Sequence, residues 1–227
     1  MQIAYRDIQD WNKWPRSVAS LEQVQDKPNL LSFSREKNSH RGIAELQSLR
    51  KLSARGVNEE FLLEISKLEN LEYLDIETVT AENLLPLRNL RNLQTLKLSG
   101  IRKATNFEPL IRLLGLKRLF VENAKHLTSL DFLVGANHLT AIGVEGSMWT
   151  KQKIDGLAPL ANLQRLEGLF LTSVTLRDKS LSCLSEIPHL RVLECARFSP
   201  KSEFSKLRNL LPNLKCRWCD EYEITQP

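Results

Sequence analysis

Residues 82–98 read ENLLPLRNLRNLQTLKL and contain two apolar spacings in succession. The first runs from Leu84 to Leu90 in steps of three, as apolar side chains do along one side of a short helix. The second is the triplet L-x-x-L-x-L from Leu93 to Leu98, whose last two leucines stand at i and i+2. Residues at that spacing face the same side of an extended segment. The stretch therefore predicts a short helical turn followed by a very short strand.

The triplet recurs nine times along the chain, at steps of 21, 22, 22, 23, 23, 27, 24 and 21 residues. The nine copies are Pro28-Leu31-Phe33, Leu49-Leu52-Ala54, Leu71-Leu74-Ile76, Leu93-Leu96-Leu98, Leu116-Leu119-Val121, Leu139-Ile142-Val144, Leu166-Leu169-Leu171, Leu190-Leu193-Cys195 and Leu211-Leu214-Cys216. One such strand cannot bury its apolar side alone, but stacked copies can, each as one rung of a parallel sheet.

Helical spacing follows several triplets, in the ranges 61–68, 84–90, 107–113 and 181–187. Pro86, Pro109 and Pro159 each lie near the start of such a stretch, where a missing backbone N–H is no loss. We therefore predict that short α and 3₁₀ turns connect the strands.

Residues 82–98 and DGLAPLANLQRLEGLFL (155–171) resemble the repeats of the bacterial internalin-type leucine-rich repeat family. The resemblance covers about residues 28–218. It implies an α/β solenoid, a right-handed horseshoe of about nine rungs. Short parallel strands would line its concave face, and short α or 3₁₀ helices its convex face.

One position departs from the family pattern, which places an asparagine three residues after the last strand leucine. The positions here are Glu36, Val57, Val79, Ile101, Ala124, Ser147, Val174 and Phe198. The turn must therefore satisfy its backbone groups in another way, and its interior should be more apolar than in the family.

The repeat divides the chain into an N-terminal cap (1–27), the repeats (28–218) and a C-terminal tail (219–227). An end rung would otherwise expose its core. Apolar residues of the cap should cover the first rung: Trp11, Trp14, Val18, Leu21 and Val24. Trp218 should help to close the other end.

Composition argues against several classes of protein. The net charge is +5, from 32 basic and 27 acidic residues, and the excess is spread along the chain without a basic cluster. The charged N-terminus resembles no signal peptide, and no apolar run reaches the length of a membrane span. Cysteines at inward strand positions suit a reducing compartment. We therefore expect a cytoplasmic, monomeric protein without membrane contact, or an effector exported without a cleaved signal. The resemblance to internalin-type repeats implies a bacterial source.

Catalytic and cofactor motifs are missing from the sequence. The four histidines (His40, His126, His138 and His189) are scattered, and no phosphate loop or nucleophile elbow occurs. We expect no enzymatic activity, cofactor or metal. One C-x-x-C, Cys216 to Cys219, leaves a metal or redox role open, although zinc would need further ligands. The simpler interpretation places Cys216 in the core and Cys219 in the cap.

The residues that alternate with the strand leucines face outward and form columns across the rungs. The middle column contains Phe120, Gly143 and Phe170 in consecutive rungs. Two exposed rings beside a glycine would form an apolar notch, rimmed by Arg118, Glu122 and Glu145, that receives an apolar anchor from a protein partner. Serine at both phenylalanines should then weaken binding and leave the melting temperature nearly unchanged. Alternatively, Trp149 or its loop covers the rings.

The 27-residue step places an insertion at residues 146–156, which contains Met148 and Trp149. Insertions in solenoids form loops, often on the binding side. Trp149 could rim the notch or fill the turn interior, and we prefer the interior position.

These observations favour a non-enzymatic module that binds another protein on its concave face, as a scaffold, an inhibitor or immunity protein, or an effector. The predicted contact residues are Tyr73, Lys97, Arg118, Phe120, Glu122, Gly143, Glu145, Trp149, Phe170 and Thr172. The alternative is nucleic-acid binding through basic concave residues: Lys51, Arg55, Lys97, Arg118 and Arg217.

Overall fold

The computed structural model describes residues 14–24 and 26–224. The expectation for Trp11 lies outside these residues. The chain forms two compact units that divide between His126 and Leu127, and each is described by itself. No helix in the described ranges is both long and apolar enough to cross a bilayer.

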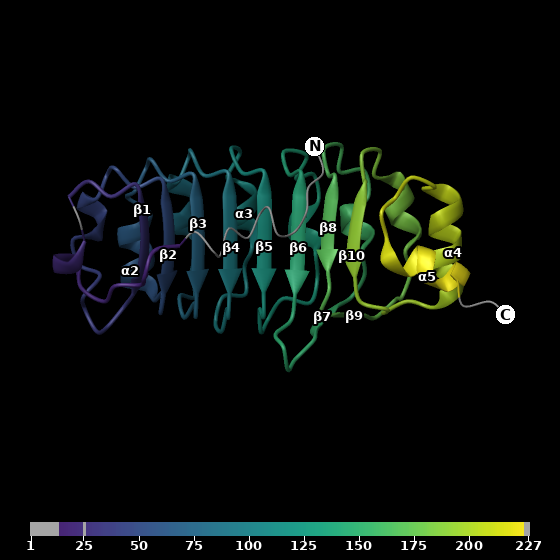
Figure 1. Cartoon of the computed structure of the whole chain (residues 1–227), viewed down its shortest axis with the longest axis horizontal. Helices are drawn as coiled ribbons and strands as arrows, with labels where there is room; N and C mark the ends of the chain where they lie inside the picture. The colour runs from purple at the N-terminus through teal and green to yellow at the C-terminus, as the bar shows by residue number, and fades with distance from the viewer. Residues whose placement is uncertain (1–13, 25, 225–227) are drawn as a thin grey trace. The chain divides into compact units, whose positions relative to one another are not determined.

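The first unit contains five parallel strands that pair in chain order (Figure 1). They are β1 (Leu30–Ser34), β2 (Lys51–Arg55), β3 (Tyr73–Glu77), β4 (Thr95–Ser99) and β5 (Arg118–Glu122). The helical turns are η2 (Leu21–Gln23), η3 (Ile43–Glu45), α2 (Glu59–Ile65), η4 (Leu85–Asn89) and α3 (Glu108–Ile111). The predicted mixture of α and 3₁₀ turns is confirmed, with Pro86 and Pro109 in the first turns of η4 and α3.

The second unit repeats this arrangement with β6 (Ala141–Glu145), β8 (Gly168–Leu171) and β10 (Val192–Cys195). Its helices are η5 (Asp131–Leu133), η6 (Ala158–Leu160), η7 (Ser182–Glu186), α4 (Lys201–Leu210) and α5 (Arg217–Ile224). Lys215 forms a single bridge to Val192, which marks the ninth rung. The sequence did not predict a second small sheet, in which β7 (Gln152–Ile154) pairs with β9 (Val174–Leu176).

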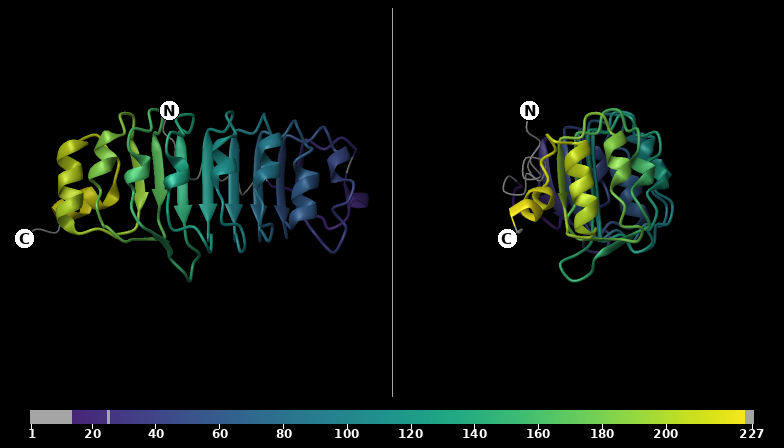
Figure 2. Two further views of the ribbon diagram at one scale, coloured as in Figure 1. Left: turned by 180° about the vertical axis from the view of Figure 1, so that it is seen from behind. Right: turned by 90° about the vertical axis from the view of Figure 1, so that its right-hand side faces the viewer.

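The strand register agrees with the repeat alignment, since Leu52 pairs with Leu31 and with Leu74. These leucines face the core and are buried. In each unit the helical turns that connect the strands cover the face of the sheet opposite to the one seen in Figure 1, as the view from behind in Figure 2 shows. The predicted fold class, an α/β solenoid of leucine-rich repeats, is confirmed. We call the side of each sheet that these turns do not cover its outward face.

The turns after the strands of the first unit explain how the chain dispenses with the asparagine ladder. The residue after each of β2, β3, β4 and β5 is left-handed: Gly56, Thr78, Gly100 and Asn123 have φ of 77°, 56°, 63° and 52°. The Gly56 N–H donates to the carbonyl of Glu77, and the Thr78 N–H to that of Ser99, both at 2.9 Å. Backbone bonds between rungs thus replace the side-chain ladder. Buried Val57, Val79, Ile101 and Ala124 fill the interior, as predicted.

Thr78 is the strained member of this series, because a β-branched residue is disfavoured at positive φ. Its side chain is exposed, so its removal loses no packing. We expect Thr78→Gly to raise the free energy of unfolding by roughly 0.5–1 kcal/mol, the relieved strain exceeding the entropy cost of glycine. Thr175→Gly, at an exposed position within β9, should have the opposite sign. Urea denaturation of both variants tests this, and destabilisation by Thr78→Gly would contradict it.

The described part of the predicted cap meets the first unit in two ways. Val18 forms a parallel bridge to Phe33, which continues the sheet beyond β1. Trp14 lies on the outward face, its ring centroid 5.6 Å from that of Tyr73 with an interplanar angle of 62°. The chain before η2 therefore covers part of this face as well as its end.

Candidate functional site

The outward face of the first unit carries charges that are shielded from solvent. Asp75 pairs in register with Lys97, and both side chains are buried. Lys97 Nζ lies 4.0 Å from Glu122 Oε2. Burial raises the pKa of Asp75 to about 6, although the positive charge of Lys97 opposes that shift. The side chains of Asp75 and Lys97 are 1% and 3% exposed, so the outward face is shielded from solvent at these rungs.

Phe120 lies beside Lys97 in the same column, in the register that the sequence predicts. Its side chain is only 4% exposed, so the expectation of an exposed ring here is wrong. The repeat pattern correctly gave the side of the strand on which Phe120 lies. It could not show that this side is covered, as the contact of Trp14 with Tyr73 shows for the third rung.

Phe170, in the second unit, is 0% exposed, which removes the second wall of the predicted notch. Its in-register neighbours are Gly143, itself buried, and Glu194. The alternative to an open notch was that Trp149 or its loop covers the rings, but Trp149 is 90% exposed. Trp149 therefore neither covers the phenylalanine rings nor fills the interior of the turn, and both of these suggestions are wrong.

The 146–151 segment, which we call the Trp149 loop, presents two large apolar side chains to solvent. Met148 and Trp149 are each 90% exposed. In Figure 1 the loop projects beyond the strand ends between β6 and β7. Exposed large apolar residues that lie side by side are typical of an interaction site.

Hydrogen bonds fix the shape of the Trp149 loop. The Ser147 hydroxyl accepts the N–H groups of Trp149 and Thr150 at 3.2 and 3.0 Å, and the Ser147 N–H donates to the Thr150 carbonyl at 2.7 Å. A Cβ at Gly146 would collide with the backbone of Thr150 and Gln152, so the tight closure requires glycine. The two apolar side chains thus stand on an ordered turn.

The base of the Trp149 loop is joined to the next rung. The carbonyl of Ser173 accepts the N–H groups of Gly146 and Gln152 at 3.0 and 2.9 Å. The Ser173 hydroxyl donates to the Ser147 carbonyl at 3.2 Å. Beside it, the exposed Thr172 hydroxyl donates to Glu145 Oε1 at 2.5 Å. The structure therefore brings together three of the predicted contact residues, Glu145, Trp149 and Thr172, and Met148 joins them.

The remaining predicted contact residues lie along the first unit. Arg118 is half-buried, and its Nη1 donates to Thr95 Oγ1 at 3.5 Å. Tyr73 and Glu122 are also half-buried, and Tyr73 contacts Trp14 as described.

The basic residues of the nucleic-acid alternative are largely engaged within the protein. Arg55 Nη2 lies 2.6 Å from Glu77 Oε2, and Lys97 is buried near Glu122. Arg217 lies over the ring of Trp218, with Cζ 5.2 Å from the centroid. Lys51, Arg55 and Arg217 are exposed, whereas Lys97 is buried and Arg118 is half-buried, so two of the five cations are withdrawn from a phosphate-binding surface.

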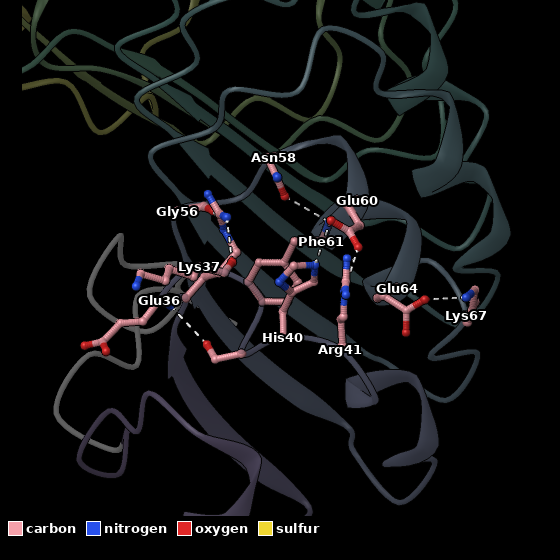
Figure 3. Close-up of polar contacts among 12 residues, drawn as sticks. Glu36, Lys37, His40, Arg41, Gly56, Asn58, Glu60, Phe61, Glu64 and Lys67 are labelled. Atoms are coloured by element: carbon pink, nitrogen blue, oxygen red, sulfur yellow. Dashed lines mark hydrogen bonds and ion pairs between the residues drawn. The ribbon is translucent and has the colours of Figure 1, made fainter.

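His40 lies in the turn before η3 and is buried (Figure 3). Its ring centroid is 5.0 Å from that of Phe61, and its Nε2 is 3.8 Å from Glu60 Oε2. Glu60 instead accepts a hydrogen bond from Arg41 Nε at 3.0 Å. Burial lowers the pKa of His40, which keeps the ring neutral. The cluster therefore supports packing between η3 and α2.

No group of three or more histidine, cysteine or carboxylate side chains within residues 14–24 and 26–224 is arranged to hold a metal ion. The C-x-x-C cysteines are both buried, and Cys216 joins the core as the simpler interpretation expects.

Solved structures share this fold. An internalin of Listeria monocytogenes, InlF, aligns with 81% of the chain at 16% identity and a TM-score of 0.53. A leucine-rich repeat protein of Leptospira interrogans aligns with 88% at 19% identity and a TM-score of 0.57. The chain spans 66% of the length of the internalin and 57% of that of the leptospiral protein. No family model and no curated protein matches the sequence. The likeness to leucine-rich repeat proteins stated from residues 82–98 and 155–171 is confirmed at the level of the fold.

Proposed function

We propose that this chain is a non-enzymatic module that binds another protein, and that the Trp149 loop with Glu145 and Thr172 forms its main contact surface. The observation that carries the proposal is the 90% exposure of Met148 and Trp149 on an ordered turn. Tryptophan supplies large binding energies at interfaces, and methionine adapts to the shape of a partner. A loop already fixed by hydrogen bonds loses little entropy on binding.

The surface proposed here differs from the apolar notch that the sequence predicts. Lys97, Phe120, Gly143 and Phe170 are buried and are not assigned to the contact. Tyr73, Arg118 and Glu122 remain partly accessible on the first unit, and we propose them as secondary contacts. Free cysteines throughout the described residues suit a reducing compartment, which supports a cytoplasmic location.

A double variant, Met148→Ser with Trp149→Ser, tests the proposal. Leu114→Ser is the matched control, because Leu114 is also large, apolar and 79% exposed but lies outside the Trp149 loop. Immobilised parent and variants are incubated with extract of the source cell, and the retained proteins are quantified by mass spectrometry. We expect the loop variant to lose at least about tenfold of a specific protein that the control retains, since central aromatic residues dominate such contacts.

Both variants should melt like the parent, because surface substitutions change stability by only about 0.5 kcal/mol. The same retained proteins at the same amounts for all three chains would refute the assignment of the loop as the contact.

A further inference from the structure

The middle column of the outward face is buried at three consecutive rungs of the first unit. Asp75, Lys97 and Phe120 pair in register on β3, β4 and β5, and all three side chains are almost completely shielded from solvent. The connecting helical turns lie on the opposite face of the sheet, as Figure 2 shows, so they do not account for this burial. Another segment of the chain must therefore lie on the outward face.

The burial begins at a definite rung. Ser53 occupies the same column on β2, with a paired strand on either side, and is half-buried. Neighbouring strands alone therefore leave even a small side chain of this column accessible. Trp14 contacts Tyr73 on the outward face at the third rung, and the burial of the column starts at that rung. The cover thus begins where the chain before η2 reaches the face.

The cover is narrow. At the third and fifth rungs the residues on either side of the middle column are half-buried: Tyr73, Glu77, Arg118 and Glu122. Each lies two positions along its strand from the middle column, about 6–7 Å away. At the fourth rung the burial extends to Thr95. A single segment that crosses the strands along the middle column gives this pattern, whereas a broad cover would also bury the residues on both sides.

From this pattern we propose that residues 1–13 dock along the middle column across β3, β4 and β5, so that the chain occupies its own outward face. These residues directly precede Trp14, which already lies on that face. The third and fifth rungs are about 10 Å apart, whereas thirteen extended residues span roughly 40 Å, so the segment is long enough. The docking site is separate from the Trp149 loop and independent of the proposed function.

The composition of the segment suits the face that it would cover. Residues 1–13 read MQIAYRDIQDWNK and contain four large apolar side chains: Ile3, Tyr5, Ile8 and Trp11. They also carry charges of both signs, as Asp75 and Lys97 do on the face. Apolar burial stabilises the docked segment, and opposite charges offset the cost of desolvating the two buried ions. Because the segment is tethered, its effective concentration is in the millimolar range, and weak contacts suffice.

The docked segment closes the outward face of the first unit to other molecules. A partner that used Lys97 or Phe120 would have to displace residues 1–13 and would lose the free energy of that contact. The exposed Trp149 loop needs no such displacement.

Acetylation of Lys97 tests the proposal in the full chain. The protein is treated with an N-hydroxysuccinimide ester of acetic acid, and the modified lysines are quantified by mass spectrometry of its peptides. Lys125 is the internal reference, because it is an exposed lysine of the same unit. In the parent, Lys97 should react at least about tenfold more slowly than Lys125, since a buried amine reacts only when its cover opens.

A variant of the segment should remove this protection. It replaces the four apolar residues, as Ile3→Ser, Tyr5→Ser, Ile8→Ser and Trp11→Ser. Lys97 should then react within about threefold of the rate of Lys125, because the segment has lost its apolar contact. The matched control replaces polar residues of the same segment, as Gln2→Ser, Gln9→Ser and Asn12→Ser, and should protect Lys97 as the parent does. Hydrogen exchange of the β4 amides in the same samples checks that the strand stays folded.

Three results would overturn the proposal. Equal rates for Lys97 and Lys125 in the parent would show that the face is open. Protection of Lys97 that persists in the apolar variant would assign the cover to another segment. Protection that is lost equally in the matched control would show that the apolar side chains are not its cause.

A second measurement needs no substitution and so does not depend on the folding of a variant. The parent is acetylated over about a hundredfold range of protein concentration, and a tethered segment should protect Lys97 equally throughout. Protection that falls on dilution would assign the cover to a second copy of the chain, and the docking of residues 1–13 on their own unit would be wrong.

Discussion

Replacing Phe170 by alanine is expected to lower the free energy of unfolding by about 3–5 kcal/mol, as for other fully buried phenylalanines. Phe170 has no exposed surface, and its neighbour Gly143 has no side chain that could move into the space. The cavity would therefore persist and add to the lost burial. Urea denaturation followed by circular dichroism measures the effect.

Trp149→Ala is the matched control for this experiment. Trp149 lies in the same unit and is larger than Phe170, but it is 90% exposed. Its removal should change stability by no more than about 0.5 kcal/mol. If Phe170→Ala were equally mild, the ring would not be buried in solution, and the sequence-based expectation of an open notch with an unchanged melting temperature would be restored.

The strands and their register were predictable because the leucine period has a direct physical cause. A residue such as Leu74 must face the core if its rung is to stack on the rungs of Leu52 and Leu96. The positions of Pro86 and Pro109 likewise followed from the geometry of a first helical turn.

Accessibility of the outward residues was not predictable from the same pattern. Alternation states which side of a strand Phe120 occupies, but coverage of that side depends on where a distant segment lies. One sequence feature that could have indicated coverage is Trp14, an aromatic residue before the first triplet. Its ring contacts that of Tyr73 on the outward face. Sequence reasoning assigned it to the end of the stack because a cap is the usual role of such a segment.

The apolar interior of the turns was predictable from the sequence, but their left-handed backbone was not predicted. The missing asparagines correctly indicated an apolar interior, and Gly56 and Gly100 at equivalent positions were a signal for left-handed backbone that sequence reasoning did not use. Thr78 at the same position obscures that signal.

The second large effect concerns Asp75, whose replacement by asparagine is expected to raise the free energy of unfolding at pH 7 by roughly 2–3 kcal/mol. Burial raises the folded-state pKa of Asp75 from 3.8 to about 6. Below pH 3.8 the carboxyl is thus neutral in both the folded and the unfolded chain, and Asp75 then does not lower the free energy of unfolding through ionisation. As the pH rises from 3.8 through 6, ionisation becomes less favourable in the folded chain than in the unfolded one, and stability is lost.

The pH dependence separates this cause from a general packing effect. Asparagine does not ionise, so the gain from Asp75→Asn should vanish near pH 3, grow between pH 4 and 6, and stay constant above. Asp75 Oδ1 has no hydrogen-bond partner among the described residues, so the substitution leaves no new unpaired group at that atom. Asp131→Asn, at an exposed carboxylate, should change stability by no more than about 0.5 kcal/mol at either pH. A gain from Asp75→Asn that is the same at pH 3 and pH 7 would show that the carboxyl is not desolvated, and the covered outward face inferred from it would lose its electrostatic support.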